Sequence, residues 1–321
     1  MKITVGSFNL NNLFSRFNFK VNINEIKYGP NVTYTFDKDD HFWIRNFKGK
    51  LVKPKKYESK LEIAERIKRL NLDILCVQEV EDIGTLKGFN KYYLGDNSYP
   101  YVVLIEGNDS RLIDVGLLSR YPIGAITSWK EARAEGHEDK GPVFGRDLLQ
   151  VEILNRSGNK KLFTIFNTHL KSNFVPYDAE DPVASVVANN EKRKLQSAAI
   201  ARIIKSVTRP NSSYILTGDM NDVPESEFLK PFTEDDELNL TDALANPTEV
   251  GEMNKTKYPP DTHIWTHRFS PEAGHYDYHL YDHIWISNAL TDNFMGSYID
   301  RRTKVSGNGS DHDAVWIELE F

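Results

Sequence analysis

Hydrophobic and polar residues alternate along the chain in many short runs, which is the pattern of half-buried β-strands. These runs are rich in β-branched and aromatic residues and are bounded by Gly, Pro, Asn or Asp, as strands usually are. They are KITVGSFNL, LDILCVQEV, YVVLIEG, DVGLLSR, RDLLQVEIL, KLFTIFNTHL, SYILTGDM, DTHIWTH, YDHIWIS and AVWIELEF. Strands are therefore predicted from the first residues of the chain to the last.

Two segments instead repeat their apolar residues every three or four positions, as amphipathic α-helices do. In the segment 58–71, Ile63, Ile67 and Leu70 share one face and lysine and glutamate occupy the other. The segment 189–207 has similar apolar rows. Each predicted helix lies between two predicted strands, so the order strand, helix, strand occurs twice.

This order of elements predicts an α/β fold: a four-layered α/β sandwich of two mostly antiparallel sheets, face to face, with helices outside. No stretch rich in Pro, Gly or Ser divides the chain, so we expect a single domain over residues 1–321. Residues 18–57 and 129–145 lack clear periodicity. We expect both to be long surface insertions, which are uncommon unless they are functional or mobile.

The composition limits the class of protein. Hydrophobic residues make up 40% of the 321 residues, enough for a substantial core. The formal net charge of −6 argues against a protein that coats nucleic acid by charge alone. The single cysteine, Cys76, lies in an apolar run and is expected to be buried. No apolar run is long enough for a membrane span, and no targeting segment is visible, so we expect a cytoplasmic protein, although the mature form of a secreted protein would look the same.

Several of the predicted strands end in clusters of polar side chains. One such cluster alone is better explained as a turn, because Asn and Asp favour turns and a lone His is usually structural. Several clusters at the ends of apolar strands are harder to explain in that way, since loops at strand ends are where a scaffold places reactive groups. The clusters are Asn9 with Asn11, Gln78 with Glu79, Asn167 with His169, Asp219 with Asn221, and Asp311 with His312.

Together these motifs resemble the endonuclease/exonuclease/phosphatase superfamily, and within it the deoxyribonuclease-like branch with bacterial members. The resemblance runs in order through SFNLNNLF, VQEV, DVGLLSR, NTHLKS, TGDMND, YDHIWIS and SDHD, from residue 7 to residue 315. No single motif is decisive, but the ordered set is specific. The resemblance implies the same layered sandwich and a hydrolase that cleaves phosphoester bonds.

The resemblance also implies a metal site. Glu79 would be the principal metal carboxylate, and Asn9 and Asp311 would complete the site directly or through water. Hard oxygen ligands suit Mg²⁺, for which Mn²⁺ can substitute. Many members carry an acidic residue where this chain has Asn11, which favours a single catalytic ion here.

The catalytic roles follow from the same resemblance. Asp219 and Asn221 would bind and orient the attacking water, and His169 would donate a hydrogen bond to a phosphoryl oxygen. The general base is either Asp219 or His312, and Asp282 would hold His312 in place. Both candidates for the base are expected to be essential.

Further residues are candidates for substrate contact. Asn167 lies two residues before the strand-end histidine and would support its site, and Lys171 continues the same alternation. Lys171 could equally be a solvated lysine, and Arg146 could equally form a structural ion pair. Arg301 and Arg302 are weaker candidates, in the loop before SDHD.

The leading hypothesis is a nuclease or DNA phosphodiesterase, with nucleic acid as its substrate. The alternative is a phosphatase acting on small phosphorylated molecules or lipid head groups, which the same residues would support. A binding protein with degraded chemistry is disfavoured, because the catalytic set is nearly intact. The basic segment 45–60, flanked by Trp43 and containing Phe47 and Tyr57, could follow a nucleic-acid backbone, although a solvated loop is also consistent with it.

Overall fold

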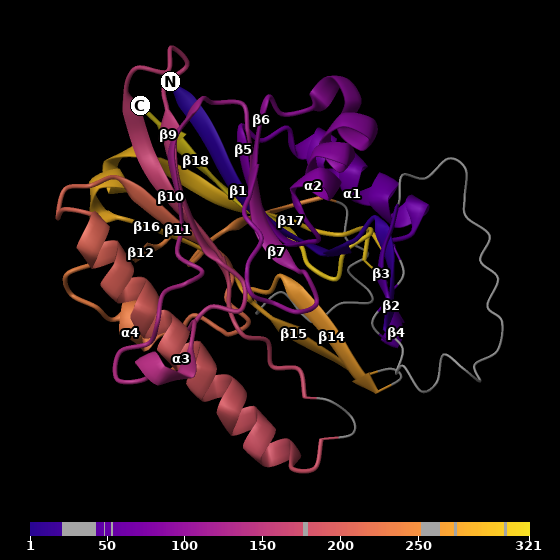
Figure 1. The fold of residues 1–321 in the computed structure, drawn as a ribbon. Helices are drawn as coiled ribbons and strands as arrows, with labels where there is room; N and C mark the ends of the chain where they lie inside the picture. The colour runs from indigo at the N-terminus through magenta and orange to yellow at the C-terminus, as the bar shows by residue number, and fades with distance from the viewer. Residues whose placement is uncertain are drawn as a thin grey trace, which may run out of the picture.

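Two β-sheets face each other, and helices cover their outer faces (Figure 1). This arrangement confirms the predicted α/β sandwich. The computed structural model describes residues 1–20, 43–47, 49–52, 54–175, 179–251, 264–272, 275–304 and 307–321. The basic segment 45–60 and the first predicted insertion therefore lie partly outside the described residues.

Within the described residues, the strands form two large sheets and two small ones. The order in the first sheet is β13 (Thr248–Val250), β17 (Phe294–Asp300), β18 (Ala314–Glu320), β1 (Lys2–Leu13), β5 (Ile74–Val80), β7 (Asp114–Ser119) and β6 (Tyr101–Leu104). The order in the second is β12 (Thr241–Asp242), β16 (Asp282–Ile286), β11 (Tyr214–Asp219), β10 (Lys161–His169), β9 (Leu148–Leu154) and β8 (Ile123–Ser128). The small sheets contain β2 (Arg16–Lys20), β3 (Trp43–Phe47) and β4 (Gly49–Val52), and the hairpin of β14 (His267–Glu272) and β15 (His275–His279).

The two predicted strand, helix, strand units each produce a parallel pair of strands. Parallel neighbours need a crossover connection, which α1 (Tyr57–Leu70) supplies between β1 and β5, and α3 (Pro182–Val207) supplies between β10 and β11. Parallel strands end at the same edge of a sheet. The polar clusters near the ends of β1 and β5, and those at the ends of β10 and β11, are therefore neighbours in space.

Three apolar clusters hold these layers together. The central cluster fills the space between the sheets and includes Cys76, which is buried as predicted. A second cluster lies under α1 and α2 (Ile83–Phe89), on the outer face of the first sheet. The third lies under α3 and α4 (Lys230–Thr233), on the outer face of the second sheet. The amphipathic rows of both predicted helices therefore face a sheet.

Several local predictions differ from the structure. α3 begins at Pro182 rather than at residue 189, with the Asp181 side chain accepting a hydrogen bond from the Ala184 amide (2.9 Å). The run DTHIWTH was predicted as a strand, but residues 264–266 are irregular and β14 begins only at His267. The predicted insertion 129–145 packs against α3, since Val143 and Phe144 are buried in the third cluster.

Of the helices described, none is both long and apolar enough to cross a membrane.

Candidate active site

The polar strand ends of the second sheet lie side by side at one edge. In the ladder, His169 on β10 is opposite Asp219 on β11, and Asp219 is opposite Asp282 on β16. Asn9, on β1 of the first sheet, reaches across and donates a hydrogen bond from Nδ2 to Asp219 Oδ2 (2.8 Å). Asp219 is therefore one of the points at which polar side chains of the two sheets meet.

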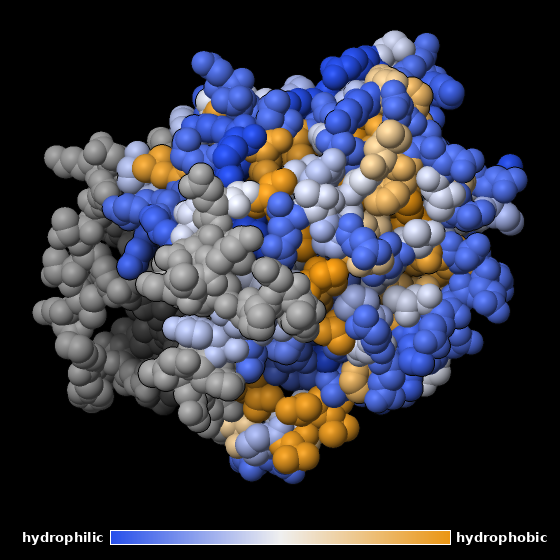
Figure 2. Space-filling view, turned by 180° about the vertical axis from the view of Figure 1, so that it is seen from behind, coloured by the Kyte–Doolittle hydropathy of each residue, from blue (hydrophilic) through white to orange (hydrophobic). Residues whose placement is uncertain are grey.

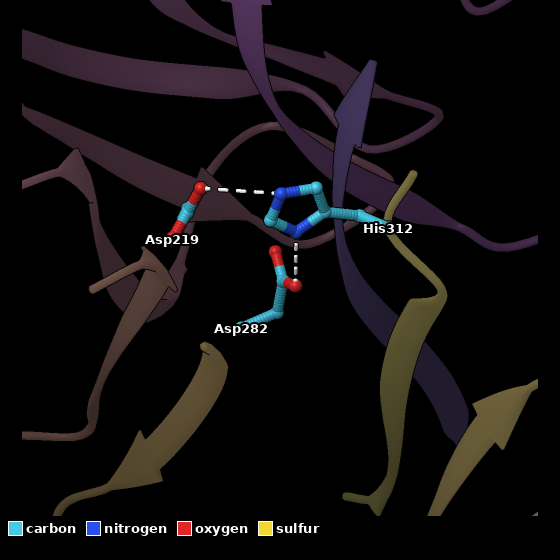
Figure 3. A group of neighbouring side chains, drawn as sticks. All are labelled: Asp219, Asp282 and His312. Atoms are coloured by element: carbon cyan, nitrogen blue, oxygen red, sulfur yellow. Dashed lines mark hydrogen bonds and ion pairs between the residues drawn. The ribbon is translucent and has the colours of Figure 1, made fainter. Parts of the chain in front are cut away.

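Asp219, His312 and Asp282 form a compact group (Figure 3). His312 Nδ1 lies 2.6 Å from Asp282 Oδ2, and its other ring nitrogen, Nε2, lies 3.7 Å from Asp219 Oδ2. His169 approaches the same Asp219 oxygen, with Nε2 at 3.4 Å. One buried carboxylate thus has an imidazole on each of two sides, and all four side chains are buried.

The two histidines have opposite electrostatic environments. Burial lowers the pKa of His169 well below its ordinary value, and the nearby cations Arg146 and His312 lower it further. Burial also disfavours protonation of His312, but Asp282 and Asp219 outweigh this effect and raise the pKa of His312 to about 10. Burial raises the pKa of the Asp219 carboxyl to about 7, and the neighbouring Asp282 contributes in the same direction. At neutral pH, His169 is therefore neutral and His312 is an imidazolium.

Two polar atoms of this group have no hydrogen-bond partner among the described residues. These are Nδ1 of His169 and Oδ1 of Asp282, both of which are buried. Buried polar atoms are usually paired, because an unpaired one loses its hydrogen bonds to water. Both atoms are therefore candidates for contact with a substrate or with the attacking water.

Two of the residues predicted to bind metal, Glu79 and Asp311, lie around one lysine ammonium. Lys55 Nζ donates to the backbone oxygen of Asn11 (2.5 Å), and burial lowers the pKa of Lys55 to about 8 although Asp311 and Glu79 act to raise it. The carboxylates of Glu79 and Asp311 must therefore both lie near the Lys55 ammonium. The Asn11 side chain donates to Asp311 Oδ1 (2.6 Å), and the Asn12 amide donates to Glu79 Oε2 (2.9 Å).

The backbone around this group is strained. Asn11, Asn12, Glu79 and Asn221 all have φ between 48° and 59°, in the left-handed region that residues other than glycine rarely adopt. Such positions cost about 1–3 kcal/mol each and persist where surrounding contacts enforce them. For Glu79 the conformation is especially informative, because glutamate has no local tendency to adopt it. The strain supports a functional role for the predicted metal carboxylate.

A second group also has the composition of a cation site. Ligand atoms of Asp219, Asp282 and His312 all lie within 4.8 Å of one another. An ion bound there would compete with the hydrogen bond between His312 and Asp282 and would need a neutral His312. A cation at Glu79 and Asp311 would need no change of protonation at His312; it would take the place of the Lys55 ammonium beside them, and their oxygen donors suit a hard divalent cation.

The structure assigns Asn167 a position between the sheets rather than in an open site. Its Oδ1 accepts from Gln78 Nε2 (2.8 Å), and its Nδ2 donates to the backbone oxygens of Gly116 (2.8 Å) and Val77 (3.3 Å). Both amide hydrogens are thus directed at the first sheet. A direct substrate contact by Asn167 stays a prediction, whereas its cross-sheet hydrogen bonds position the strand that carries His169.

The other predicted contacts surround the end of β10. Arg146 is buried, donates to the backbone oxygen of Leu170 (2.8 Å), and pairs with Asp109 (Nε to Oδ2, 3.1 Å). Asn221 Nδ2 donates to the same Leu170 oxygen (3.2 Å), and its backbone amide donates to Asp219 Oδ1 (2.9 Å). Arg146 thus forms the ion pair that sequence analysis left open, and its charge still acts on His169.

Arg301 and Arg302 have structural partners. With Arg66 they surround Asp313, which is fully buried, at distances of 3.0 to 3.3 Å. The same arginines also hold the SDHD loop: Arg302 donates to the backbone oxygen of Asp311 (2.6 Å), and Arg66 donates to that of His312 (3.2 Å). This cluster fixes the backbone that carries the candidate metal ligand Asp311 and the His312 imidazolium.

Sequence analysis missed a row of rings beside His312. The His267 ring lies 4.6 Å from that of His312, and it stacks on Tyr281 at 5.3 Å, which in turn stacks on His279 at 4.9 Å. His267 and His279 are paired across the β14–β15 hairpin. Both histidines are distant in sequence from SDHD. The alternation of rings in HYDYHLYD could have indicated His279 and Tyr281, whereas His267 lies outside that run.

The profile of the Endonuclease/Exonuclease/phosphatase family matches residues 6–312. The chain belongs to this family. Members are metal-dependent hydrolases of phosphoester bonds, which agrees with carboxylates and histidines at the strand ends. No curated protein matches the chain.

Among the solved structures that share the fold of this family member over almost its full length, the following are each 16% identical in sequence. An endonuclease/exonuclease/phosphatase from Bacteroides vulgatus has a TM-score of 0.59 and covers 100% of this chain and 99% of its own. The match to an AP endonuclease from Archaeoglobus fulgidus (TM-score 0.57) covers 99% of this chain and 100% of that one. The match to a mannosyl-6-phosphatase from Bacteroides thetaiotaomicron (TM-score 0.55) likewise covers 99% of this chain and 100% of that one. At this identity the likeness establishes the fold, and proteins named for different substrates share it.

Proposed function

We propose that this protein is a Mg²⁺-dependent phosphodiesterase that cleaves nucleic acid by in-line attack of water. The observation that carries the proposal is the arrangement of Asp219 between a neutral imidazole, His169, and a charged one, His312. When the environment pushes the pKa values of neighbouring groups apart in this way, one group can act as an acid, another as a base and a third as a hydrogen-bond donor.

Asp219 is the proposed general base. Its carboxylate is buried, and its raised pKa of about 7 makes it basic enough to accept a proton from water near neutral pH. His312 is a poor base because its own proton is held by two carboxylates. We assign it instead to stabilising the negative charge that develops on the phosphoryl group, with Asp282 fixing its orientation.

His169 contributes a hydrogen bond rather than a charge. Its neutral ring has one N–H, which can be directed at a phosphoryl oxygen or at Asp219, depending on the tautomer. Asn221 holds the Asp219 carboxylate through its backbone amide, and its side chain is hydrogen-bonded to Leu170. We therefore assign Asn221 the role of positioning Asp219, whereas from the sequence we expected it to orient the attacking water directly.

Glu79 and Asp311, with Asn9 nearby, are the residues that would hold Mg²⁺. Two carboxylates and an amide oxygen are the donors that this ion prefers. When bound, Mg²⁺ polarises a phosphoryl oxygen and offsets its charge. Asn9 also orients Asp219 through its Nδ2 atom, so the same amide connects the metal residues to the base.

Two features support nucleic acid as the substrate. The stacked rings of His267, Tyr281 and His279 provide flat faces beside the catalytic histidine, on which a base could stack. Arg146 and Lys171 place positive charge next to His169, where it can attract a phosphate backbone. A phosphatase that acts on small phosphate esters would use the same catalytic group and is the alternative outcome of the experiment.

Purified protein should be incubated with Mg²⁺ and either supercoiled plasmid, single-stranded oligonucleotide, or a panel of sugar phosphates and inositol phosphates. The Asp219→Asn variant and excess chelator serve as controls for contaminating activity. We expect nicking or strand cleavage that both controls abolish. Release of phosphate from the small esters, with the nucleic acids left intact, would instead establish the phosphatase function.

A further inference from the structure

A pocket of about 500 Å³ opens beside the catalytic group, and four cationic side chains line it. We call it the cationic pocket; its charged lining residues are Arg111, Arg146, Lys171, Lys192 and Asp109. They come from the loop between β6 and β7, the start of β9, the end of β10 and the first half of α3. Segments far apart in sequence therefore place their positive charges around one space.

The charges of the cationic pocket are poorly balanced. Asp109 is the one carboxylate among the lining residues described, and it is shared by Arg111 (2.9 Å) and Arg146 (3.1 Å). The ammonium groups of the two lysines contact backbone oxygens: Lys171 that of Ser172 (3.1 Å), and Lys192 that of Pro142 (3.3 Å). Partial burial and the repulsion of Arg146 and Arg111 lower the pKa of Lys171 to about 8.

This imbalance is unexpected in a chain whose formal net charge is −6. Gathering partly buried cations around one carboxylate is costly, because each loses hydration and repels the others. The cost is recovered when an anion enters, since charged hydrogen bonds to phosphate are strong. A structural ion-pair network would instead provide carboxylates in similar number.

The pocket also has an apolar side. Phe174 lines it and is 59% exposed, and Val183, Val186 and Val187 are exposed on the neighbouring part of α3. Figure 2 shows this apolar surface at the lower edge of the molecule, over the first half of α3. A phosphate attached to a ring or another apolar group would contact both the cations and this surface.

We propose that the cationic pocket binds a second phosphate of the substrate, linked covalently to the phosphoester that is cleaved beside His169. This inference rests on the proposed function and specifies its substrate class as molecules with at least two phosphate groups. Lys171 is two residues from His169, so the two sites share a border. The second phosphate can belong to the next position of a nucleic-acid strand or to a small bisphosphorylated molecule.

Binding tests the pocket separately from turnover. In the presence of Mg²⁺, the slow Asp219→Asn protein would be titrated calorimetrically with two pairs of probes. One pair is the thymidine dinucleotide with and without a 5′-phosphate, and the other is inositol 1,4-bisphosphate and inositol 1-phosphate. We expect the second phosphate to improve the Kd by about tenfold to a hundredfold in one pair, as one or two charged hydrogen bonds would.

Lys192→Met removes the charge but keeps most of the length of the side chain, and Arg111→Gln removes a second charge. In the Asp219→Asn background, the two changes together should abolish the preference for the second phosphate. Lys194→Met is the matched control, because Lys194 is exposed on the same helix and does not line the pocket. It should leave the preference intact.

Each outcome is decisive. A preference in the dinucleotide pair identifies a strand as the source of the second phosphate, and a preference in the inositol pair identifies a small molecule. No preference in either pair, or one that survives Lys192→Met with Arg111→Gln, overturns the pocket assignment. Absence of turnover by the wild-type protein, with the preference intact, would refute hydrolysis while the assignment of the pocket stands.

Discussion

Asp114 offers a quantitative test of the electrostatics near the site. Its side chain is 1% exposed; Oδ1 accepts a hydrogen bond from the Gly107 amide (2.8 Å), and Oδ2 has no partner among the described residues. Burial raises the pKa of Asp114 from 3.8 to about 7. A shift of one pKa unit corresponds to about 1.36 kcal/mol. Above pH 7, ionisation of this carboxylate therefore lowers the free energy of unfolding by about 4 kcal/mol.

The sign of the pH effect follows from proton binding. Between pH 3.8 and about 7 the folded state holds the Asp114 proton and the unfolded state has lost it, so the free energy of unfolding falls as pH rises. Between pH 5 and pH 8 this single group should remove about 3 kcal/mol of stability. The Asp114→Asn variant cannot ionise and should lack this loss.

Urea unfolding at intervals from pH 5 to pH 8 would measure the difference between wild type and Asp114→Asn. Other titrating groups, such as Asp147, whose pKa burial raises to about 6, are present in both proteins and largely cancel. Asp96→Asn is the control, because that side chain is exposed. If the stability curves of wild type and Asp114→Asn run parallel, the burial argument is wrong.

Further predictions concern turnover. Asp219→Asn and His312→Ala should each lower kcat by about a thousandfold or more, because each removes a group that acts in the transition state; near-normal kcat in a protein with an unchanged circular dichroism spectrum would refute the assigned role. His169→Ala should lower kcat by roughly a hundredfold, the usual effect of removing one preorganised donor, and steady-state kinetics would reveal a smaller or larger role. Chelation should abolish turnover and added Mg²⁺ should restore it, whereas activity that persists in excess chelator would exclude a metal requirement.

Local patterns were sufficient to predict much of the fold. Alternation marked most strands of both sheets, and the apolar rows of segments 58–71 and 189–207 marked the two crossover helices. The first part of α3 was missed because Val183, Val186 and Val187 are exposed and form no core-facing row. The strands β8 and β17 have mixed burial along their length, so their alternation was too weak to detect.

The site was predictable where its residues end apolar strands. His169 and Asp219 were identified in this way, as the last residues of β10 and β11. Asp282 begins β16 and was identified only through the family resemblance; the ladder places the three residues on adjacent strands. The cationic pocket was not predictable as a unit, because Arg111 and Lys192 have no shared local pattern and meet only through the tertiary fold. Likewise, the contact of Arg301 and Arg302 with Asp313 is a property of loop geometry rather than of residue order.

The hydrogen bonds between the sheets give the active site a mechanical role. An apolar interface between two sheets resists separation but constrains sliding only weakly, since dispersion contacts are not directional. The hydrogen bonds from Asn9 to Asp219 and from Gln78 to Asn167 are directional, so they set the alignment of one sheet on the other. Mild heating that breaks these hydrogen bonds should impair turnover before the sandwich unfolds. A variant that lost Asp219 along with its activity would need another polar contact between the sheets to keep them aligned.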